Sequence, residues 1–119
     1  MIDDSENKKN LHVAGAKDDG GKPNMNLVLG GFPDALLAVG RVGTYGANKY
    51  TPYGWHEVED GVNRYLSALL RHYIAYVKGN KLDGESYLPH LAHLAWNSLA
   101  VLQLELEKVS SDQLVDVTI

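Results

Sequence analysis

The sequence feature that most constrains the fold is a helical repeat of apolar residues between Asp60 and Lys78. The apolar positions are Val62, Tyr65, Leu66, Leu69, Leu70, Tyr73, Ile74 and Val77. Because they recur at intervals of three and four, they lie on one face of an α-helix. Glu59 or Asp60 can cap the start, and Gly79 follows where a left-handed residue often ends a helix. The pattern therefore predicts a long amphipathic helix.

A second long helix is expected from Pro89 to about Lys108, since proline suits the first turn of a helix. Its expected buried positions are Leu91, Leu94, Ala95, Leu99, Val101, Leu102 and Leu106. No alternating pattern of useful length, which would indicate a strand, precedes residue 110. The sequence therefore predicts an all-α fold, a small bundle built on two long antiparallel helices.

The part of the chain before these helices is less regular. A shorter helix is expected from Pro33 to Val42, ending near Gly43, and Thr44 to Trp55 is interpreted as a structured loop rich in glycine and aromatic residues. A chain of 119 residues has room for one domain. We expect a flexible arm at 1–14, a single all-α nucleotide-binding domain at 15–109 and a tail at 110–119.

Composition excludes several classes of function. Eleven basic against fifteen acidic residues give a net charge of -4, so the cationic surface of a protein that binds duplex nucleic acid is not expected. The chain has no cysteine, which excludes disulfides and thiolate chemistry and favours a reducing compartment. The first ten residues are polar, unlike a signal peptide, and no stretch is apolar enough for a membrane span. We expect a cytoplasmic protein.

Polar side chains gather on one face of each long helix. His90, His93 and Asn97 share a stripe of the last helix, because residues three, four and seven apart face the same way. On the preceding helix, Arg64 and Arg71 are seven apart, with Ser67 on the same stripe and His72 beside it. Antiparallel packing would bring these two groups into one pocket.

Such a pocket has three interpretations. His72 and His90 can be helix-end histidines with a purely structural role. Alternatively, His90 and His93 are neutral imidazole ligands of a metal, joined by His72, Asp83 or Glu85. In the third interpretation the arginines, lysines and His72 bind the oxygen atoms of a phosphate group.

The loop before the long helices favours the phosphate interpretation. Gly46 allows close approach of a ligand, Lys49 offers a positive charge, and Tyr50 and Trp55 offer flat surfaces for a nucleobase. The alternative is that the two aromatic rings belong to the core and anchor the loop.

Two lysines of the N-terminal segment are further candidates for phosphate contact. Lys17 and Lys22 flank Asp18, Asp19, Gly20 and Gly21, but the spacing of a Walker phosphate loop is missing. The segment therefore predicts either a phosphate contact or a solvated arm.

Four motifs in order make the chain similar to a known family. They are Gly15 to Pro23, Thr44 to Tyr50 with Trp55, Leu70 to His72, and Leu88 to Asn97. Together they resemble the phage and prophage family called dATP/dGTP diphosphohydrolase, N-terminal domain. The resemblance implies cleavage of a purine deoxynucleoside triphosphate to the monophosphate and pyrophosphate, in the cytoplasm of a host cell. It also implies a MazG-like helical bundle that forms dimers or tetramers and holds magnesium through acidic side chains.

The chain departs from the MazG pattern of carboxylates, E-E-x-x-E on one helix and E-x-x-D on the next. Arg71-His72 and His90-x-x-His93 stand on the comparable helices. Either the metal is bound partly by histidine, or the site binds a nucleotide without hydrolysing it. The first hypothesis is therefore a phage-type pyrophosphohydrolase. The second is a noncatalytic protein that sequesters a nucleotide or cyclic nucleotide signal.

These hypotheses assign the candidate residues to three roles. The catalytic candidates are His90, His93 and Asp83. The ligands for a divalent metal, Mg²⁺ or Mn²⁺, are His90, His93, Asp83 and Glu85. The nucleotide-binding candidates are Lys17, Lys22, Lys49, Tyr50, Trp55, Arg64, Arg71, His72 and Asn97. The expected partners are a purine nucleotide and further copies of the chain, because Leu99, Leu102 and Leu106 have few apolar partners in a lone chain.

Overall fold

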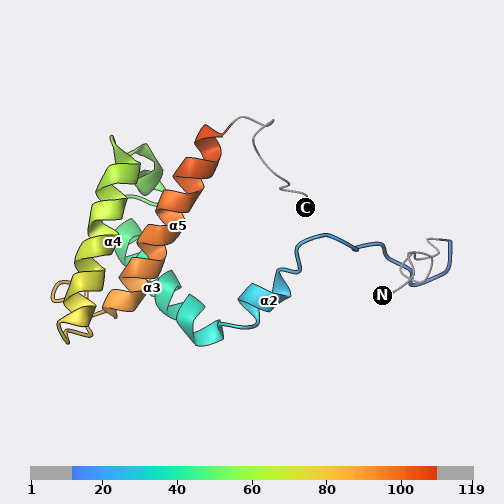
Figure 1. The fold of residues 1–119 in the computed structure, drawn as a ribbon, viewed down its shortest axis with the longest axis horizontal. Helices are drawn as coiled ribbons and strands as arrows, with labels where there is room; N and C mark the ends of the chain where they lie inside the picture. Colours follow the sequence, from blue (N-terminus) through green and yellow to red (C-terminus); the bar gives the residue numbers. More distant parts are fainter. Residues whose placement is uncertain (1–11, 110–119) are drawn as a thin grey trace.

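The computed structural model describes residues 12–109 of the chain and shows an all-α fold (Figure 1). Its elements are α2 (Asn26–Leu29), α3 (Pro33–Lys49), the short 3₁₀ helix η1 (Gly54–Glu57), α4 (Gly61–Val77) and α5 (His90–Lys108). No strand occurs among these residues, so the predicted fold class is confirmed. Most of the expected arm at 1–14 and all of the tail at 110–119 lie outside the described residues.

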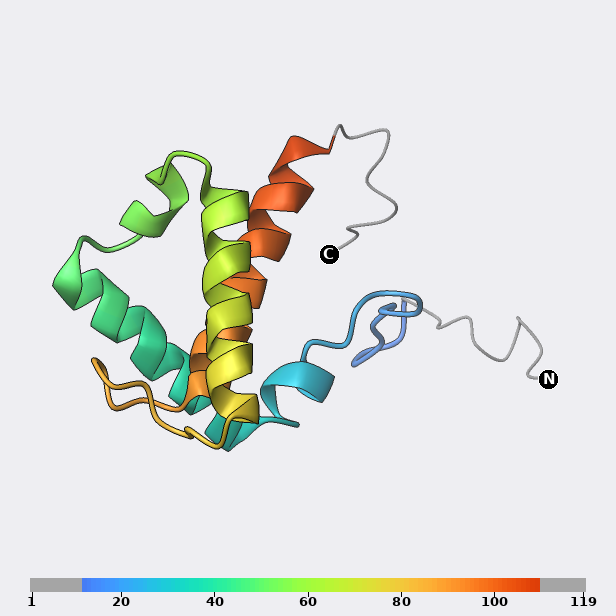
Figure 2. The ribbon, with the colours of Figure 1, turned by 60° about the vertical axis from the view of Figure 1, so that its left-hand side comes forward.

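Helices α4 and α5 form the predicted antiparallel pair and lie side by side along most of their length (Figures 1 and 2). Helix α4 ends as expected, because Gly79 adopts a left-handed φ of 96°. Its N–H donates to the carbonyl of Tyr76, and that of Asn80 donates to the carbonyl of Ala75. The chain then turns back and enters α5 directly after Pro89.

The sequence analysis predicted that the helix beginning at Pro33 ends near Gly43. This prediction is wrong, since α3 continues to Lys49. Three glycines inside it suggested a loop, and each weakens an isolated helix by about 1 kcal/mol relative to alanine. One of these glycines lies in the contact between α3 and α5. A β-carbon at Gly43 would lie 3.4 Å from Nε1 of Trp96, so α3 lies against α5 at this glycine. Only residues 50–53 and η1 remain of the predicted loop.

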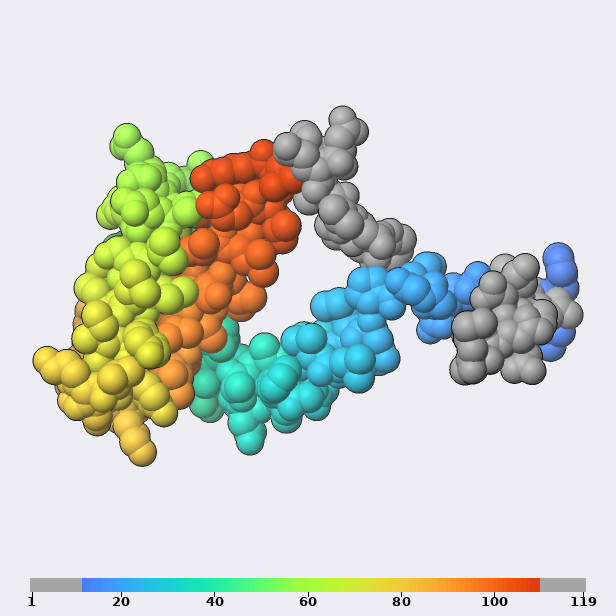
Figure 3. Space-filling model, in the orientation of Figure 1, coloured from blue at the N-terminus to red at the C-terminus, as the bar shows by residue number. Residues whose placement is uncertain are grey.

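The segment before α3 projects from the bundle (Figure 3). The short helix α2 within it was not predicted, because a single turn is too short to show a helical repeat. Residues 12–25 form turns and irregular backbone. This segment makes the molecule elongated, with extents of 56 × 32 × 29 Å.

The apolar core of the described residues is small. It consists of Val42, Ala92 and Ala100, and no large side chain there is fully buried. The expectation that four leucines of α5 are buried is wrong for the single chain: Leu91, Leu99, Leu102 and Leu106 are exposed. Most of the apolar repeat of α4 is exposed as well, at Leu66, Leu70, Tyr73, Ile74 and Val77.

Within residues 12–109, no helix combines the length and the apolar character needed to cross a membrane.

Candidate functional site

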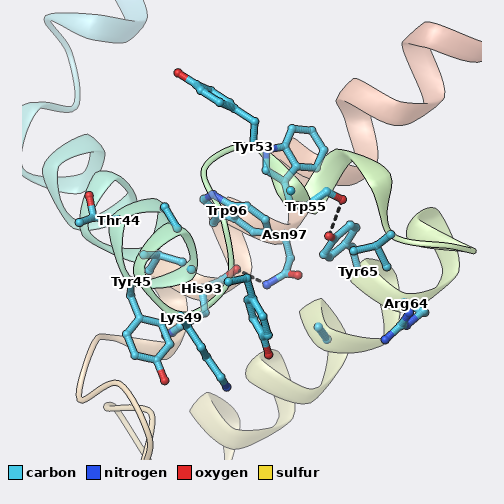
Figure 4. A pocket seen from close by; sticks show the side chains of 18 of the residues that line it. Thr44, Tyr45, Lys49, Tyr53, Trp55, Arg64, Tyr65, His93, Trp96 and Asn97 are labelled. Carbon is cyan, nitrogen blue, oxygen red and sulfur yellow. Dashed lines mark hydrogen bonds between the residues drawn. The ribbon is translucent and has the colours of Figure 1, made fainter.

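An open cleft of about 1130 Å³ lies between the C-terminal half of α3, the loop into η1, the first part of α4 and the first half of α5 (Figure 4). Each wall contributes polar or aromatic side chains. Six of the predicted nucleotide-binding residues line it: Lys49, Tyr50, Trp55, Arg64, Arg71 and Asn97. The predicted packing of α4 against α5 therefore does bring residues from distant parts of the sequence together.

The cationic side of the cleft is a stripe of α4. Arg64 and Arg71 are exposed, and Ser67 lies between them as its spacing predicted. Nη1 of Arg71 donates to Oγ of Ser67 over 2.9 Å, which fixes the direction of that side chain. Guanidinium groups have several donors in one plane, so both arginines remain suited to contact phosphate oxygens.

The third predicted cation is already paired. Nζ of Lys49 donates to Oε1 of Glu85 over 2.5 Å and lies over the rings of Tyr45 and Tyr50. This contact lowers the pKa of Glu85 and raises that of Lys49. An incoming phosphate would have to compete with Glu85 for the ammonium group.

Aromatic rings form another part of the cleft lining, beginning with Tyr65, which lies next to Arg64 (Figure 4). Trp55 makes edge-on contacts with Tyr65 and Trp96, whose ring centroids lie 6.2 and 5.8 Å away. The hydroxyl of Tyr65 donates to the carbonyl of Trp55 over 2.6 Å. Trp55 therefore anchors the loop and lines the cleft at the same time. Tyr50, which is 72% exposed, is the more accessible ring for stacking on a base.

Three histidines meet where α4 ends and α5 begins. Nδ1 of His72 lies 2.8 Å from Nδ1 of His90, and the ring of His72 stacks on that of His93 at 4.5 Å. Burial, followed by repulsion from His93, lowers the pKa of His72 to about 4. Burial also lowers the pKa of His93. Both rings are therefore neutral at pH 7.

The loop between α4 and α5 folds back on this cluster. A bridge pairs Leu82 with Pro89, and the N–H of Asp83 donates to the carbonyl of Leu88. Oδ2 of Asp83 accepts bonds from the N–H and the hydroxyl of Ser86, at 2.8 and 2.9 Å. Partial burial opposes ionisation, but these donors lower the pKa of Asp83 overall. The loop thus holds an ionised carboxylate beside the histidines.

Ser86 connects the carboxylate to His93. Its Oγ lies 2.7 Å from Nε2 of His93 while also donating to Asp83. Since a hydroxyl has one proton and a carboxylate only accepts, His93 donates from Nε2, and its Nδ1 keeps a basic lone pair. Nδ2 of Asn97 donates to the carbonyl of His93 over 2.8 Å, which supports the same turn of α5.

Two of these histidines and Asp83 lie close enough together that they could hold a metal ion. His72, Asp83 and His90 each offer one ligand atom, and these atoms lie within 4.8 Å of one another. Two imidazole nitrogens and one carboxylate oxygen suit a divalent transition metal such as Mn²⁺. They fit Mg²⁺ less well, because Mg²⁺ prefers oxygen ligands throughout.

The geometry is thus a cleft with cations and aromatic rings beside a group of histidines, and its elements all fall inside one sequence match. The family model described as dATP/dGTP diphosphohydrolase, N-terminal, matches residues 12–114. The chain belongs to this family. No curated protein and no solved structure matches it significantly. Membership relates the chain to dATP/dGTP diphosphohydrolases through their N-terminal domain.

In this member of the family, some predicted site residues lie away from the cleft. Lys17 and Lys22 belong to the segment that projects from the bundle and do not line the cleft. Glu85 is paired with Lys49 and is absent from the metal-ligating group found among the described residues. His72, which the sequence analysis proposed as a nucleotide contact and as an additional metal ligand, does not line the cleft; it belongs to the group with Asp83 and His90, and His93 does not.

The sequence analysis missed several residues of the site. Ser86, Tyr65 and Trp96 were not singled out, although they hold Asp83 or Trp55 in place. The sequence Asp83-Gly84-Glu85-Ser86 did contain a signal, because an aspartate commonly binds the backbone N–H groups two and three residues later. Tyr65 was assigned to the apolar face, which hid the role of its hydroxyl.

Proposed function

We propose that this protein is a phage-type nucleoside triphosphate pyrophosphohydrolase that acts on dATP or dGTP in the cytoplasm of the host cell. The observation that supports this most strongly is that guanidinium groups and accessible aromatic rings line one cleft in a member of the dATP/dGTP diphosphohydrolase family. Such a combination suits a ligand with a flat base at one end and several phosphates at the other.

In this proposal the two walls of the cleft bind different parts of the nucleotide. Arg64 and Arg71 contact the triphosphate, where they also stabilise the negative charge that develops on the departing pyrophosphate. Tyr50 stacks on the purine, and the amide of Asn97 contacts its polar edge. Trp55 and its aromatic neighbours keep this wall in position.

The reaction is an in-line hydrolysis at the α-phosphorus. The oxygen of a water molecule forms a bond to that phosphorus, and the bond to the bridging oxygen of the β-phosphate breaks. Pyrophosphate leaves with the electron pair. His93 accepts a proton of the water at Nδ1, while Ser86 holds the ring through Nε2. A divalent metal held by His72, Asp83 and His90 would supply Lewis-acid chemistry beside the phosphates.

One observation favours a second candidate, a noncatalytic protein that sequesters a nucleotide or cyclic nucleotide signal. Among the described residues, the metal-ligating group contains a single carboxylate, Asp83, and the nearby Glu85 is paired with Lys49. The acidic pattern of MazG-like enzymes is therefore not reproduced in the cleft. Tight binding without turnover would be the expected behaviour of such a protein.

The two candidates are separated by incubating the untagged protein with dATP or dGTP and Mn²⁺ and measuring release of pyrophosphate. The enzyme releases pyrophosphate, whereas the sequestering protein returns intact nucleotide after heat denaturation. Arg71→Gln should weaken nucleotide binding about 10- to 100-fold, since a charge-assisted hydrogen bond contributes about 1.5–3 kcal/mol.

The matched control is Arg41→Gln, which removes an exposed arginine of α3 outside the cleft. This variant should bind like the wild type. If no purine nucleotide binds, or if the two variants lose affinity equally, the cleft is not the nucleotide site and the proposal is wrong.

A further inference from the structure

We infer that His72, Asp83 and His90 form a binding site for one divalent transition metal ion such as Mn²⁺, Co²⁺ or Zn²⁺, in preference to Mg²⁺. The site joins three parts of the chain: the last turns of α4, the connecting loop and the first residue of α5. The inference deepens the proposed function by naming its metal. Metal binding itself can be tested independently, whereas a catalytic role of the metal rests on the proposed function.

The spacing of the donor atoms fits one ion. Ligand atoms bound at about 2.1 Å lie about 3.0 to 3.4 Å apart on neighbouring corners of an octahedron or tetrahedron. The two Nδ1 atoms of His72 and His90 are 2.8 Å apart, and all three donor atoms lie within 4.8 Å of one another. Small rotations of the two rings would therefore suffice to bind an ion.

The facing imidazoles have a second consequence. Two neutral rings can place their Nδ1 atoms 2.8 Å apart only if one nitrogen carries a proton or if a cation lies between the two lone pairs. His90 is buried, and His72 is partly buried. Neutral imidazole is the form that binds metals, and a bound ion would replace the shared proton.

The carboxylate is fixed by its own hydrogen bonds. Ser86 holds Oδ2 of Asp83 through both its N–H and its hydroxyl, and Nε2 of His93 lies 3.9 Å from the same oxygen. Metal ligands in proteins are commonly oriented by such outer hydrogen bonds. Ser86 and His93 therefore act as positioning residues for Asp83.

The chemistry of the donors selects the metal. Nitrogen ligands bind borderline transition metals much better than they bind Mg²⁺, which keeps oxygen ligands and water. With two of three protein ligands from imidazole, the group should prefer Mn²⁺, Co²⁺ or Zn²⁺. The acidic magnesium site implied by MazG-like enzymes would be replaced by a histidine-rich one.

Metal binding can be measured without nucleotide. Untagged protein stripped of metal is titrated with Mn²⁺, and free Mn²⁺ is followed by electron paramagnetic resonance. One equivalent per chain should bind, and a large excess of Mg²⁺ should not displace it. His72→Ala and Asp83→Asn should each weaken binding by at least about tenfold. His56→Gln, which removes an exposed histidine outside the site, should leave binding unchanged.

Asp83→Asn keeps the size of the side chain, so it serves as the second test if His72→Ala does not fold; circular dichroism reports folding for each variant. Absence of stoichiometric Mn²⁺ binding, displacement by equal Mg²⁺, or unchanged affinity in both variants would overturn the inference. Metal binding without release of pyrophosphate would leave it standing and would count against the proposed enzyme only. If the wild type releases pyrophosphate but Asp83→Asn binds Mn²⁺ as tightly as the wild type, the proposed enzyme is supported and Asp83 is not a metal ligand.

Discussion

The two faces of the α4–α5 pair have opposite character. Three polar residues of α5 are buried together with Ala92 and Ala100: His90, His93 and Asn97 are only 8%, 8% and 6% exposed. The opposite face carries apolar residues that are exposed, such as Leu99 at 53% and Leu102 at 54%. Polar side chains are usually exposed and large apolar ones usually buried, so both features depart from the common pattern. In the single chain, polar side chains are thus buried on the inner face while large apolar side chains are exposed on the outer face.

Helical geometry shows that this division is systematic. At about 100° per residue, Leu66, Leu70, Tyr73 and Val77 lie on the side of α4 opposite the cleft-lining Arg64 and Arg71. The same rotation places the exposed leucines of α5 opposite His93 and Asn97. Apolar surface of this extent on a small helical domain is characteristic of an interface. We therefore expect a second copy of the chain to cover it.

The largest effect should follow from placing charge on the outer face. Leu66→Lys combined with Leu99→Lys should convert an oligomer into a monomer, because burying each leucine contributes about 1.5–3 kcal/mol and the pair changes the dissociation constant at least about 100-fold. Light scattering after gel filtration measures the mass directly. The melting temperature should also fall, since an assembly stabilises the native state.

Asn48→Lys is the control for each of the two substitutions, because it adds one lysine at an exposed position of α3. It should leave the oligomer intact. A wild-type protein that is monomeric at micromolar concentration would contradict the interpretation of the outer face.

The difference between the inner and outer faces of the α4–α5 pair also explains how much of the fold could be predicted from the sequence. The helical repeats of α4 and α5 are long, so their existence and antiparallel packing were predicted correctly. The periodicity could not show which apolar residues are buried, because a lone chain and an oligomer have the same repeat. Similarly, the glycines of α3 were interpreted as a loop, and the packing of this segment against Trp96 of α5 could not be predicted from a local pattern.

The candidate site was predicted in part for a related reason. Spacing within one helix placed Arg64 with Arg71 and His90 with His93. The antiparallel pair brings His93 into the cleft with both arginines, whereas His90 contacts His72 and does not line the cleft. The path of the connecting loop is not encoded in any repeat. The partners of Asp83 and the pairing of Lys49 with Glu85 therefore had to come from the structure.

An intermediate effect is expected on the inner face. Asn97→Ala removes the hydrogen bond from Nδ2 to the carbonyl of His93 and leaves a small space in a buried position. The free energy of unfolding should fall by about 1–2 kcal/mol, as measured by urea denaturation. Ser98→Ala, at the neighbouring exposed position, should change it by less than about 0.5 kcal/mol. Equal effects of the two substitutions would show that the polar inner face does not contribute to stability.

The smallest effect should come from the edge where η1 meets α5. Nε2 of His56 lies 2.6 Å from Oε2 of Glu107, and this hydrogen bond, with the charge of Glu107, raises the pKa of His56. Protonated His56 therefore stabilises the folded state. This contribution is complete below the unfolded pKa of about 6.5 and is lost as the pH rises through the higher pKa of the folded state.

The difference in melting temperature between wild type and Glu107→Gln should accordingly be larger at pH 6 than at pH 9. Both side chains are about two-fifths exposed, so solvent screens the pair and the difference should be small. Glu59→Gln removes an acidic group of the same charge without touching His56 and should show no such pH dependence relative to wild type. If the Glu107→Gln difference stays constant across this range, the pair does not tie η1 to α5, and the position of the aromatic wall depends on Trp55, Tyr65 and Trp96 alone.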